Sequence, residues 1–173
     1  MIAVAMNVYL VGFMGSGKSE VGRRLAEKIG WKFEDTDEIV TTLEGRTIER
    51  IFAESGEECF REAERRALGA VAAQKGRVVA TGGGMFLRVQ RRASMRETGV
   101  IVWLDASLES IRERLGPGDG RPLWSHPDPI AMRALYERRR ATYALADFRV
   151  DASAADPATI AARILARVQS VLR

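Results

Sequence analysis

The residues 12–19, GFMGSGKS, have the types and spacing of a phosphate-binding loop. They fit the pattern G-x-x-x-x-G-K-[ST], whose glycines let successive backbone N–H groups point at phosphate oxygens. Lys18 can reach the β- and γ-phosphates of a nucleotide, and the hydroxyl of Ser19 can bind Mg²⁺. The motif therefore predicts that the protein binds a nucleoside triphosphate, but it does not identify the acceptor.

The elements expected around this loop place it where phosphate binding needs it. Residues 8–11 form an apolar run rich in strand formers, and residues 18–29 repeat apolar side chains at helical spacing. The loop would lie between a buried strand and a helix N-terminus, whose dipole adds positive charge at the same place. The alternative is a glycine-rich turn that matches by chance, which the flanking strand and helix disfavour.

Two carboxylates follow the next strand-like run, residues 31–34. Asp35 and Asp37 share one side of an extended segment, because side chains alternate along a strand. One carboxylate can hold a water on Mg²⁺ while the other accepts hydrogen bonds from an acceptor hydroxyl. The alternative is that Thr36 or Asp37 caps a helix beginning at residue 38.

A helical stretch and a glycine run add further candidates. Arg61 and Glu64 are three residues apart and share a helix face. They could form a surface ion pair, or Arg61 could bind a substrate carboxylate through two hydrogen bonds while Glu64 holds its guanidinium. Glycines 82–84 follow a buried strand and cost backbone entropy. A tight turn needs fewer glycines, so we expect something to approach the backbone closely there.

Strand-like and helical stretches alternate along the whole chain. The strand-like runs are 8–11, 31–34, 77–80, 100–104 and 148–150, and the helical ones are 18–29, 38–54, 57–74, 87–97, 108–115, 130–144 and 157–172. This alternation predicts an α/β fold, a mostly parallel sheet with helices on both faces. Ligand-binding loops of such a sheet follow the carboxyl ends of its strands, where the candidates fall. We find no repeat or linker, and expect one domain, residues 1–173.

Composition narrows the classes of partner. The net charge of +4 could indicate nucleic-acid binding, but aromatic residues are few (7%) and are not interleaved with the basic runs. An enzyme for a polyphosphate and an anionic acceptor would also carry surplus arginine. No apolar run approaches the ~20 residues that span a bilayer. The single cysteine, Cys59, cannot form an internal disulfide. We expect a cytoplasmic protein with no nucleic-acid or membrane partner.

Five motifs follow one another along the chain: GFMGSGKS at 12–19, D-T-D at 35–37, F-R-E-A-E at 60–64, G-G-G at 82–84 and R-P-L at 121–123. Their order and spacing resemble those of shikimate kinase, and the resemblance covers about residues 7–172. It implies a P-loop NTPase fold like that of nucleoside-monophosphate kinases, with a five-stranded parallel sheet in the order 2-3-1-4-5. It also implies transfer of the γ-phosphoryl of ATP to the 3-hydroxyl of shikimate, with Mg²⁺ as cofactor, in chorismate and aromatic amino acid biosynthesis.

The resemblance also implies roles for individual residues. The acceptor region would be about 35–64 and a lid about 116–127. The catalytic residues would be Lys18, Asp35 and Arg121, with Asp35 orienting the acceptor or taking its proton. Mg²⁺ would bind Ser19 and, through water, Asp35. ATP would bind Gly15, Ser16, Gly17, Lys18, Ser19, Glu20, Arg114 (on the adenine) and Arg121 (at the phosphates). Shikimate would bind Asp37, Arg61, Glu64, Gly82, Gly83, Gly84 and Arg139.

Two arginines compete for the last of these positions. The family pattern R-x-P-x-Y has an arginine four residues before a tyrosine, which selects Arg139 before Tyr143. Ala141 replaces the proline of the pattern, so Arg140 remains the alternative. Leu115, where threonine is usual, weakens the assignment of Arg114.

Two rival functions remain open. One is a kinase of another small polar acid, such as gluconate, on the same fold. The other is a nucleotide-dependent switch, which would not need two carboxylate-binding arginines. We expect the protein to be a monomer.

Overall fold

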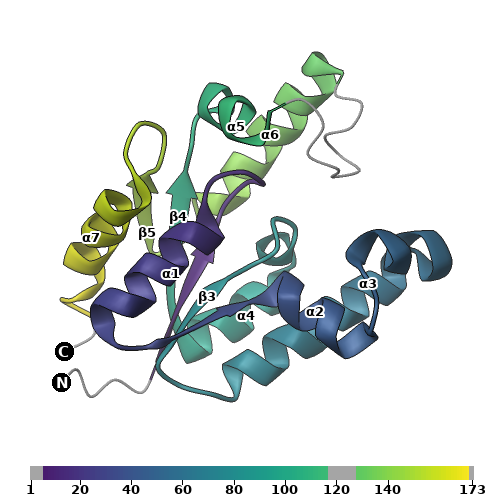
Figure 1. The fold of residues 1–173 in the computed structure, drawn as a ribbon, viewed down its shortest axis with the longest axis horizontal. Coiled ribbons are helices and arrows are strands. Elements are labelled where there is room, and N and C mark those ends of the chain that lie inside the picture. Colours follow the sequence, from purple (N-terminus) through teal and green to yellow (C-terminus); the bar gives the residue numbers. More distant parts are fainter. Residues whose placement is uncertain (1–5, 117–127, 172–173) are drawn as a thin grey trace.

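The computed structural model describes residues 6–116 and 128–171. In that part of the chain, five strands form one parallel sheet in the order β2-β3-β1-β4-β5 (Figure 1). The strands are β1 (Asn7–Val11), β2 (Lys32–Asp35), β3 (Arg77–Ala80), β4 (Gly99–Asp105) and β5 (Phe148–Asp151). The predicted α/β fold and its strand order are therefore confirmed.

Helices cover both faces of the sheet. α1 and α7 pack against each other on one face, and α3 and α4 pack together on the other, where α6 contacts the short helix η1 (Figure 1). The helical elements are α1 (Lys18–Ile29), α2 (Thr36–Glu44), α3 (Ile48–Ala72), η1 (Met85–Leu87), α4 (Val89–Thr98), α5 (Leu108–Leu115), α6 (Pro129–Tyr143) and α7 (Pro157–Val168). Among the described residues, none of these helices has the length and apolarity that crossing a membrane requires.

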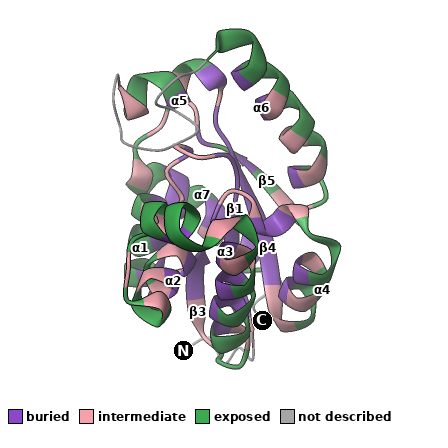
Figure 2. Cartoon of the chain, turned by 90° about the vertical axis from the view of Figure 1, so that its right-hand side faces the viewer, coloured by how far each residue is buried: buried purple, intermediate pink, exposed green. Residues whose placement is uncertain are grey.

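The core lies on both faces of the central strands. All residues of β1 are buried, and β1 pairs with β3 on one side and β4 on the other. Figure 2 shows the buried colour along these strands and on the inward sides of the helices. Because helices cover both faces, these strands are apolar without alternation. A smaller cluster, which includes Phe60 and Ala63, packs α2 against α3 and anchors the part of α3 that carries Arg61 and Glu64.

The expected break near Gly45 is present, and the boundary expected between the helical stretches 38–54 and 57–74 coincides with a kink at Gly56 inside α3, where φ is 77°. Helix α2 begins at Thr36, and its N-cap is Asp35, whose Oδ1 accepts a hydrogen bond from Asp37 N at 2.9 Å. The alternative of Thr36 or Asp37 as the cap was therefore wrong, because the Asp35 carboxylate accepts from the N–H of Asp37, the second residue of the helix.

Candidate active site

A cavity of about 590 Å³ lies at the carboxyl ends of β1, β2 and β3. Ser16 is completely buried rather than exposed to the cavity. Arg121 and lid residues 117–127 lie outside the described residues. Most residues that the sequence singled out line the cavity: Gly15, Gly17, Lys18, Ser19, Glu20, Asp35, Asp37, Arg61, Glu64, Gly82, Gly83, Gly84, Arg114 and Arg139.

The phosphate loop ends directly at the N-terminus of α1. Gly15 and Gly17 have φ values of 72° and 89°, a left-handed conformation that favours glycine. Lys18 Nζ donates hydrogen bonds to the carbonyl oxygens of Gly12 and Phe13, both at 2.9 Å. The ammonium group therefore lies over the loop, beside the helix N-terminus, and the two positive features together form an anion site.

Ser19 and Asp35 bring two oxygen groups together from different elements. Ser19 Oγ, in the first turn of α1, donates to Asp35 Oδ2, at the end of β2, at 2.6 Å. A hydroxyl and one carboxylate suit Mg²⁺, which usually keeps several waters and takes its other ligands from substrate phosphates. The described residues contain no cluster of three or more His, Cys, Asp or Glu that could enclose a metal by itself. The pair therefore fits a nucleotide-bound Mg²⁺.

The glycine segment after β3 lies against three side chains of the acceptor side. A Cβ added at Gly82 would stand 2.8 Å from Asp37 Oδ1 and 3.2 Å from Glu64 Oε1. A Cβ at Gly84 would stand 2.9 Å from Arg61 Nη1. Neither glycine has a positive φ. A side chain at either position would have to displace these charged groups, so the close approach to the backbone that we expected is present.

Arg61 is held by carboxylates on its own helix. Its Nη1 donates to Glu64 Oε2 at 2.9 Å, and its Nε and Nη2 donate to Glu57 Oε1 at 3.1 and 3.0 Å. Burial lowers the pKa of Arg61, but these carboxylates more than compensate, so its pKa is raised. The guanidinium is thus a permanent cation at the wall of the cavity, with Glu64 buried behind it.

The two candidate arginines of α6 have different surroundings. Arg139 lines the cavity with its guanidinium carbon 5.4 Å from the centre of the Phe13 ring, and its buried Nε has no hydrogen-bond partner among the described residues. Arg140 instead donates to the Tyr136 hydroxyl at 2.8 Å and to Asp105 Oδ2 at 3.0 Å. The geometry therefore favours Arg139 as the residue facing a ligand and gives Arg140 a place in the packing of α6.

Tyr143, at the end of α6, connects this helix to the glycine segment. Its hydroxyl donates to the carbonyl of Gly83 at 2.6 Å. Burial raises the pKa of Tyr143 to about 12, although the charge of the nearby Arg139 acts in the opposite direction. A Cβ at Gly83 would stand 3.6 Å from Arg139 Nη1, so the helix and the glycines meet at the cavity.

Arg114 reaches the phosphate loop from the last turn of α5. Its guanidinium donates to the carbonyl of Ser16 at 3.2 Å, and to the carbonyls of Ala152 and Ser153 after β5. These contacts place Arg114 on the nucleotide side of the cavity. They hold it against backbone and do not test its predicted packing on adenine.

Several functional candidates were missed from the sequence. Phe52 and Phe60 line the cavity and pack on each other with ring centres 4.7 Å apart. Arg91, in α4, donates to Glu64 Oε2 at 2.7 Å and is 8% exposed. Phe60 stands inside the F-R-E-A-E motif, which was a usable signal. Arg91 had none, because its contact with Glu64 joins two separate helices, and Phe52 had none, because its contact with Phe60 crosses the kink at Gly56 within α3. The remaining lining residues are Met14, Ile48, Glu49 and Thr81.

A phosphate loop after β1 of a 2-3-1-4-5 sheet, facing carboxylates and arginines across one cavity, defines a P-loop kinase of the nucleoside-monophosphate-kinase-like class. A family model described as shikimate kinase matches residues 14–169. The chain belongs to the shikimate kinase family. It is 42% identical over 163 residues to a shikimate kinase from a Sulfurihydrogenibium species, which covers 94% of this chain and 98% of the relative.

Solved structures agree with this family. The shikimate kinase of Acinetobacter baumannii, solved in complex with shikimate, superposes with a TM-score of 0.90 at 33% identity, over 96% of this chain and 94% of that one. A gluconokinase from Sinorhizobium meliloti gives a TM-score of 0.60 at 21% identity, over 98% and 94% of the two chains. At that identity the second likeness concerns the fold alone, so it adds nothing in favour of gluconate as the acceptor.

Proposed function

We propose that this chain transfers the γ-phosphoryl of ATP to the 3-hydroxyl of shikimate, giving shikimate 3-phosphate and ADP. The observation that carries the proposal is the position of Arg61 and Arg139, which line the same cavity as the phosphate loop in a chain of the shikimate kinase family. Two arginines suit an acceptor with a carboxylate, and their place in the same cavity as the loop suits in-line transfer.

On the nucleotide side, the chain's residues would bind and neutralise the triphosphate. Lys18 would leave the loop carbonyls for the β- and γ-phosphates, and Ser19 and Asp35 would hold Mg²⁺, Asp35 through water. When bound to Ser19 and, through water, Asp35, Mg²⁺ would supply positive charge that offsets the negative charge of the transfer step. Gly15, Ser16, Gly17 and Glu20 would complete the phosphate site, and Arg114 would pack on the adenine.

On the acceptor side, the residues other than Asp35 would orient shikimate rather than take part in the chemical step. Arg61 and Arg139 would bind the carboxylate, with Glu64 holding Arg61, while Asp37 and glycines 82–84 would face the hydroxyls. Phe52 and Phe60 would cover the apolar side of the ring. Asp35, next to the loop, would orient the reacting hydroxyl or take its proton.

Several expectations from the sequence remain predictions. Arg121 lies outside the described residues, and its proposed role at the phosphates rests on the R-P-L motif. We expect Arg121→Ala to lower kcat more than it weakens shikimate binding, since its charge would act on the transition state. The lid at 116–127, the single domain over residues 1–173 and the location of the protein in the cytoplasm also remain predictions. So does its monomeric state.

The experiment that tests the proposal identifies the product and then perturbs Arg61. After incubation with ATP, Mg²⁺ and shikimate, phosphorus NMR should locate one phosphate on the 3-hydroxyl. Arg61→Lys should raise the shikimate KM by about tenfold or more, because lysine keeps the charge but loses the two-pronged geometry. The ATP KM should change little. Phosphate on another hydroxyl would contradict the proposed regiochemistry, and equal changes in both KM values would remove Arg61 from the acceptor site.

A further inference from the structure

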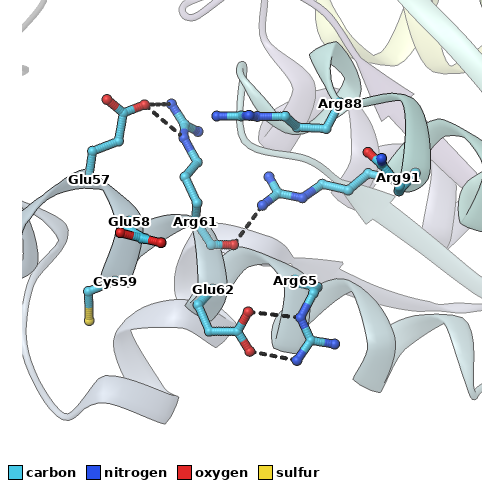
Figure 3. A pocket seen from close by; sticks show the side chains of 9 residues that line it. Glu57, Glu58, Cys59, Arg61, Glu62, Arg65, Arg88 and Arg91 are labelled. Atoms are coloured by element: carbon cyan, nitrogen blue, oxygen red, sulfur yellow. Dashed lines mark hydrogen bonds and ion pairs between the residues drawn. The ribbon is translucent and has the colours of Figure 1, made fainter.

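Arg91 lies behind the acceptor site, in a groove of about 850 Å³ between α3 and the start of α4. Figure 3 shows its side chain reaching from α4 toward the backbone of Arg61, which lines both this groove and the substrate cavity. Arg91 Nη2 donates to the carbonyl oxygen of Arg61 at 2.6 Å. This contact fixes the backbone of the residue whose side chain is proposed to bind the substrate carboxylate.

The second contact of Arg91 is with the carboxylate that holds Arg61. Glu64 Oε2 accepts from Arg61 Nη1 at 2.9 Å and from Arg91 Nη1 at 2.7 Å. Glu64 is 1% exposed, so its charge requires pairing inside the protein. One carboxylate is therefore shared between two guanidinium groups, and the exposed Glu57 is the second carboxylate partner of Arg61.

We propose that Arg91 is a positioning residue for the acceptor: by holding Glu64 and the backbone of Arg61, it aims the Arg61 guanidinium at the substrate carboxylate. The inference rests on the proposed function, because it needs a carboxylate-bearing acceptor at Arg61. Without Arg91, Glu64 would pair with Arg61 alone. The guanidinium would turn toward Glu64 and give up part of its capacity to bind a ligand carboxylate.

A purely structural role for Arg91 would give different results. If Arg91 only fastened α4 to α3, its loss would lower stability and affect both substrates alike. If it acts through Arg61, its effect should fall on shikimate and should shrink once Arg61 has been changed. Residues that act through one another give non-additive effects in double-mutant cycles, whereas independent residues give additive ones.

The matched control is Arg65, on α3. It lines the same groove, and its side chain is exposed and paired with Glu62 at 2.5 Å. Arg65→Gln removes the same charge from the same groove as Arg91→Gln does. It leaves the hydrogen bond between Arg91 and Glu64 in place. Any long-range effect of lost positive charge should therefore appear equally in both variants.

The test measures shikimate KM, ATP KM and kcat for Arg91→Gln, Arg91→Lys and Arg65→Gln, with thermal unfolding of each. Arg91→Gln should raise the shikimate KM about tenfold, the size of one hydrogen bond to a charged group, and leave the ATP KM within about twofold. Arg91→Lys should raise it less, about threefold, because it keeps the ion pair with Glu64 but loses the second donor. Arg65→Gln should leave both KM values unchanged.

Arg91→Gln is also made in an Arg61→Lys background, which completes a double-mutant cycle between the two arginines. There, Arg91→Gln should raise the shikimate KM by no more than about twofold to threefold. An additive effect, parallel changes in both KM values, or an unchanged shikimate KM would overturn the inference. If Arg91→Gln does not fold, Arg91→Lys decides by the same criteria. Failure of the unmodified chain to phosphorylate shikimate would instead overturn the proposed function.

Discussion

The two sides of the cavity are built in different ways. The nucleotide side is mostly backbone: residues 12–19 are consecutive, and their left-handed glycines and helix N-terminus create the anion site. The acceptor side is made of side chains from α2, α3 and α6, together with the glycine backbone after β3, and its residues lie as far apart in the chain as Asp37 and Arg139. The backbone half can be recognised from local sequence, whereas the side-chain half depends on how distant elements pack.

The two halves also differ in their electrostatics. On the nucleotide side, Lys18 rests on loop carbonyls that a triphosphate can replace as partners. On the acceptor side, Glu64 is buried between Arg61 and Arg91, so the Arg61 charge that is proposed to bind the acceptor is already paired in the protein. Changes on the first side should therefore act on the chemical step, and changes on the second should act on acceptor affinity.

The largest effect should follow from Lys18→Ala. Loss of an ammonium group directed at the transferred phosphate should reduce kcat by at least about 10²–10³-fold, the range seen when one transition-state donor is removed. The unfolding temperature should stay close to that of the parent, because the hydrogen bonds of Lys18 Nζ to Gly12, Phe13 and Ser16 remain within its own loop. Steady-state kinetics and thermal unfolding check both parts. A variant with substantial kcat would contradict the division between the two halves.

The next largest effect should separate the adjacent arginines of α6. Arg139→Ala should raise the shikimate KM by roughly 10- to 100-fold, because a charged two-pronged contact is lost. Arg140→Ala should leave that KM within a few-fold and lower stability by about 1 kcal/mol, since its partly exposed ion pair with Asp105 holds α6. Kinetics and denaturant unfolding of both variants measure the contrast. The reverse ranking would make Arg140 the substrate residue.

A smaller effect is expected from crowding the glycine segment. In Gly82→Ala, the new methyl group would stand 2.8 Å from Asp37 Oδ1, so the carboxylate must move. The shikimate KM should rise about tenfold while the ATP KM changes little, in line with the loss of one hydrogen bond to a charged group. The matched control is Gly69→Ala in α3, where a Cβ meets nothing within 4 Å. That variant should be stabilised by about 0.5–1 kcal/mol and keep both KM values. A normal shikimate KM for Gly82→Ala would remove the segment from the acceptor half.

The smallest effect concerns the link between α6 and the glycine segment. Tyr143→Phe removes the hydrogen bond to Gly83 and should cost about 1 kcal/mol of stability at neutral pH. Burial raises the folded-state pKa of Tyr143 from 10.0 to about 12. The unfolded chain therefore loses its phenolic proton first, and the stability of the parent falls as the pH rises from about 10 toward about 12. Denaturant unfolding at several alkaline pH values should show a shallower loss for the phenylalanine variant. Equal slopes would mean that this phenol does not titrate as described.

Features that follow a strand could be predicted from the sequence in both halves of the cavity, whereas a contact between separate helices could not. The alternation of strands and helices predicted the sheet, and the loop, Asp35, Asp37 and residues 82–84 could be placed because each follows a strand of a parallel sheet. Arg91 could not be found, since it contacts Glu64 from 27 residues away on another helix. The cap at Asp35 was missed for a related reason, because one carboxylate both ends β2 and accepts from α2.

We expect the acceptor half to select shikimate and the nucleotide half to perform the transfer. The rate of ADP release with different acceptors measures both. The unmodified chain is supplied with ATP and Mg²⁺, together with shikimate, with gluconate, or with no acceptor. We predict rapid ADP release only in the reaction that contains shikimate, and slow release in the other two reactions. Turnover with gluconate but not with shikimate would contradict the substrate assignment. ADP release that is independent of any acceptor would contradict the kinase assignment and favour a nucleotide-dependent switch.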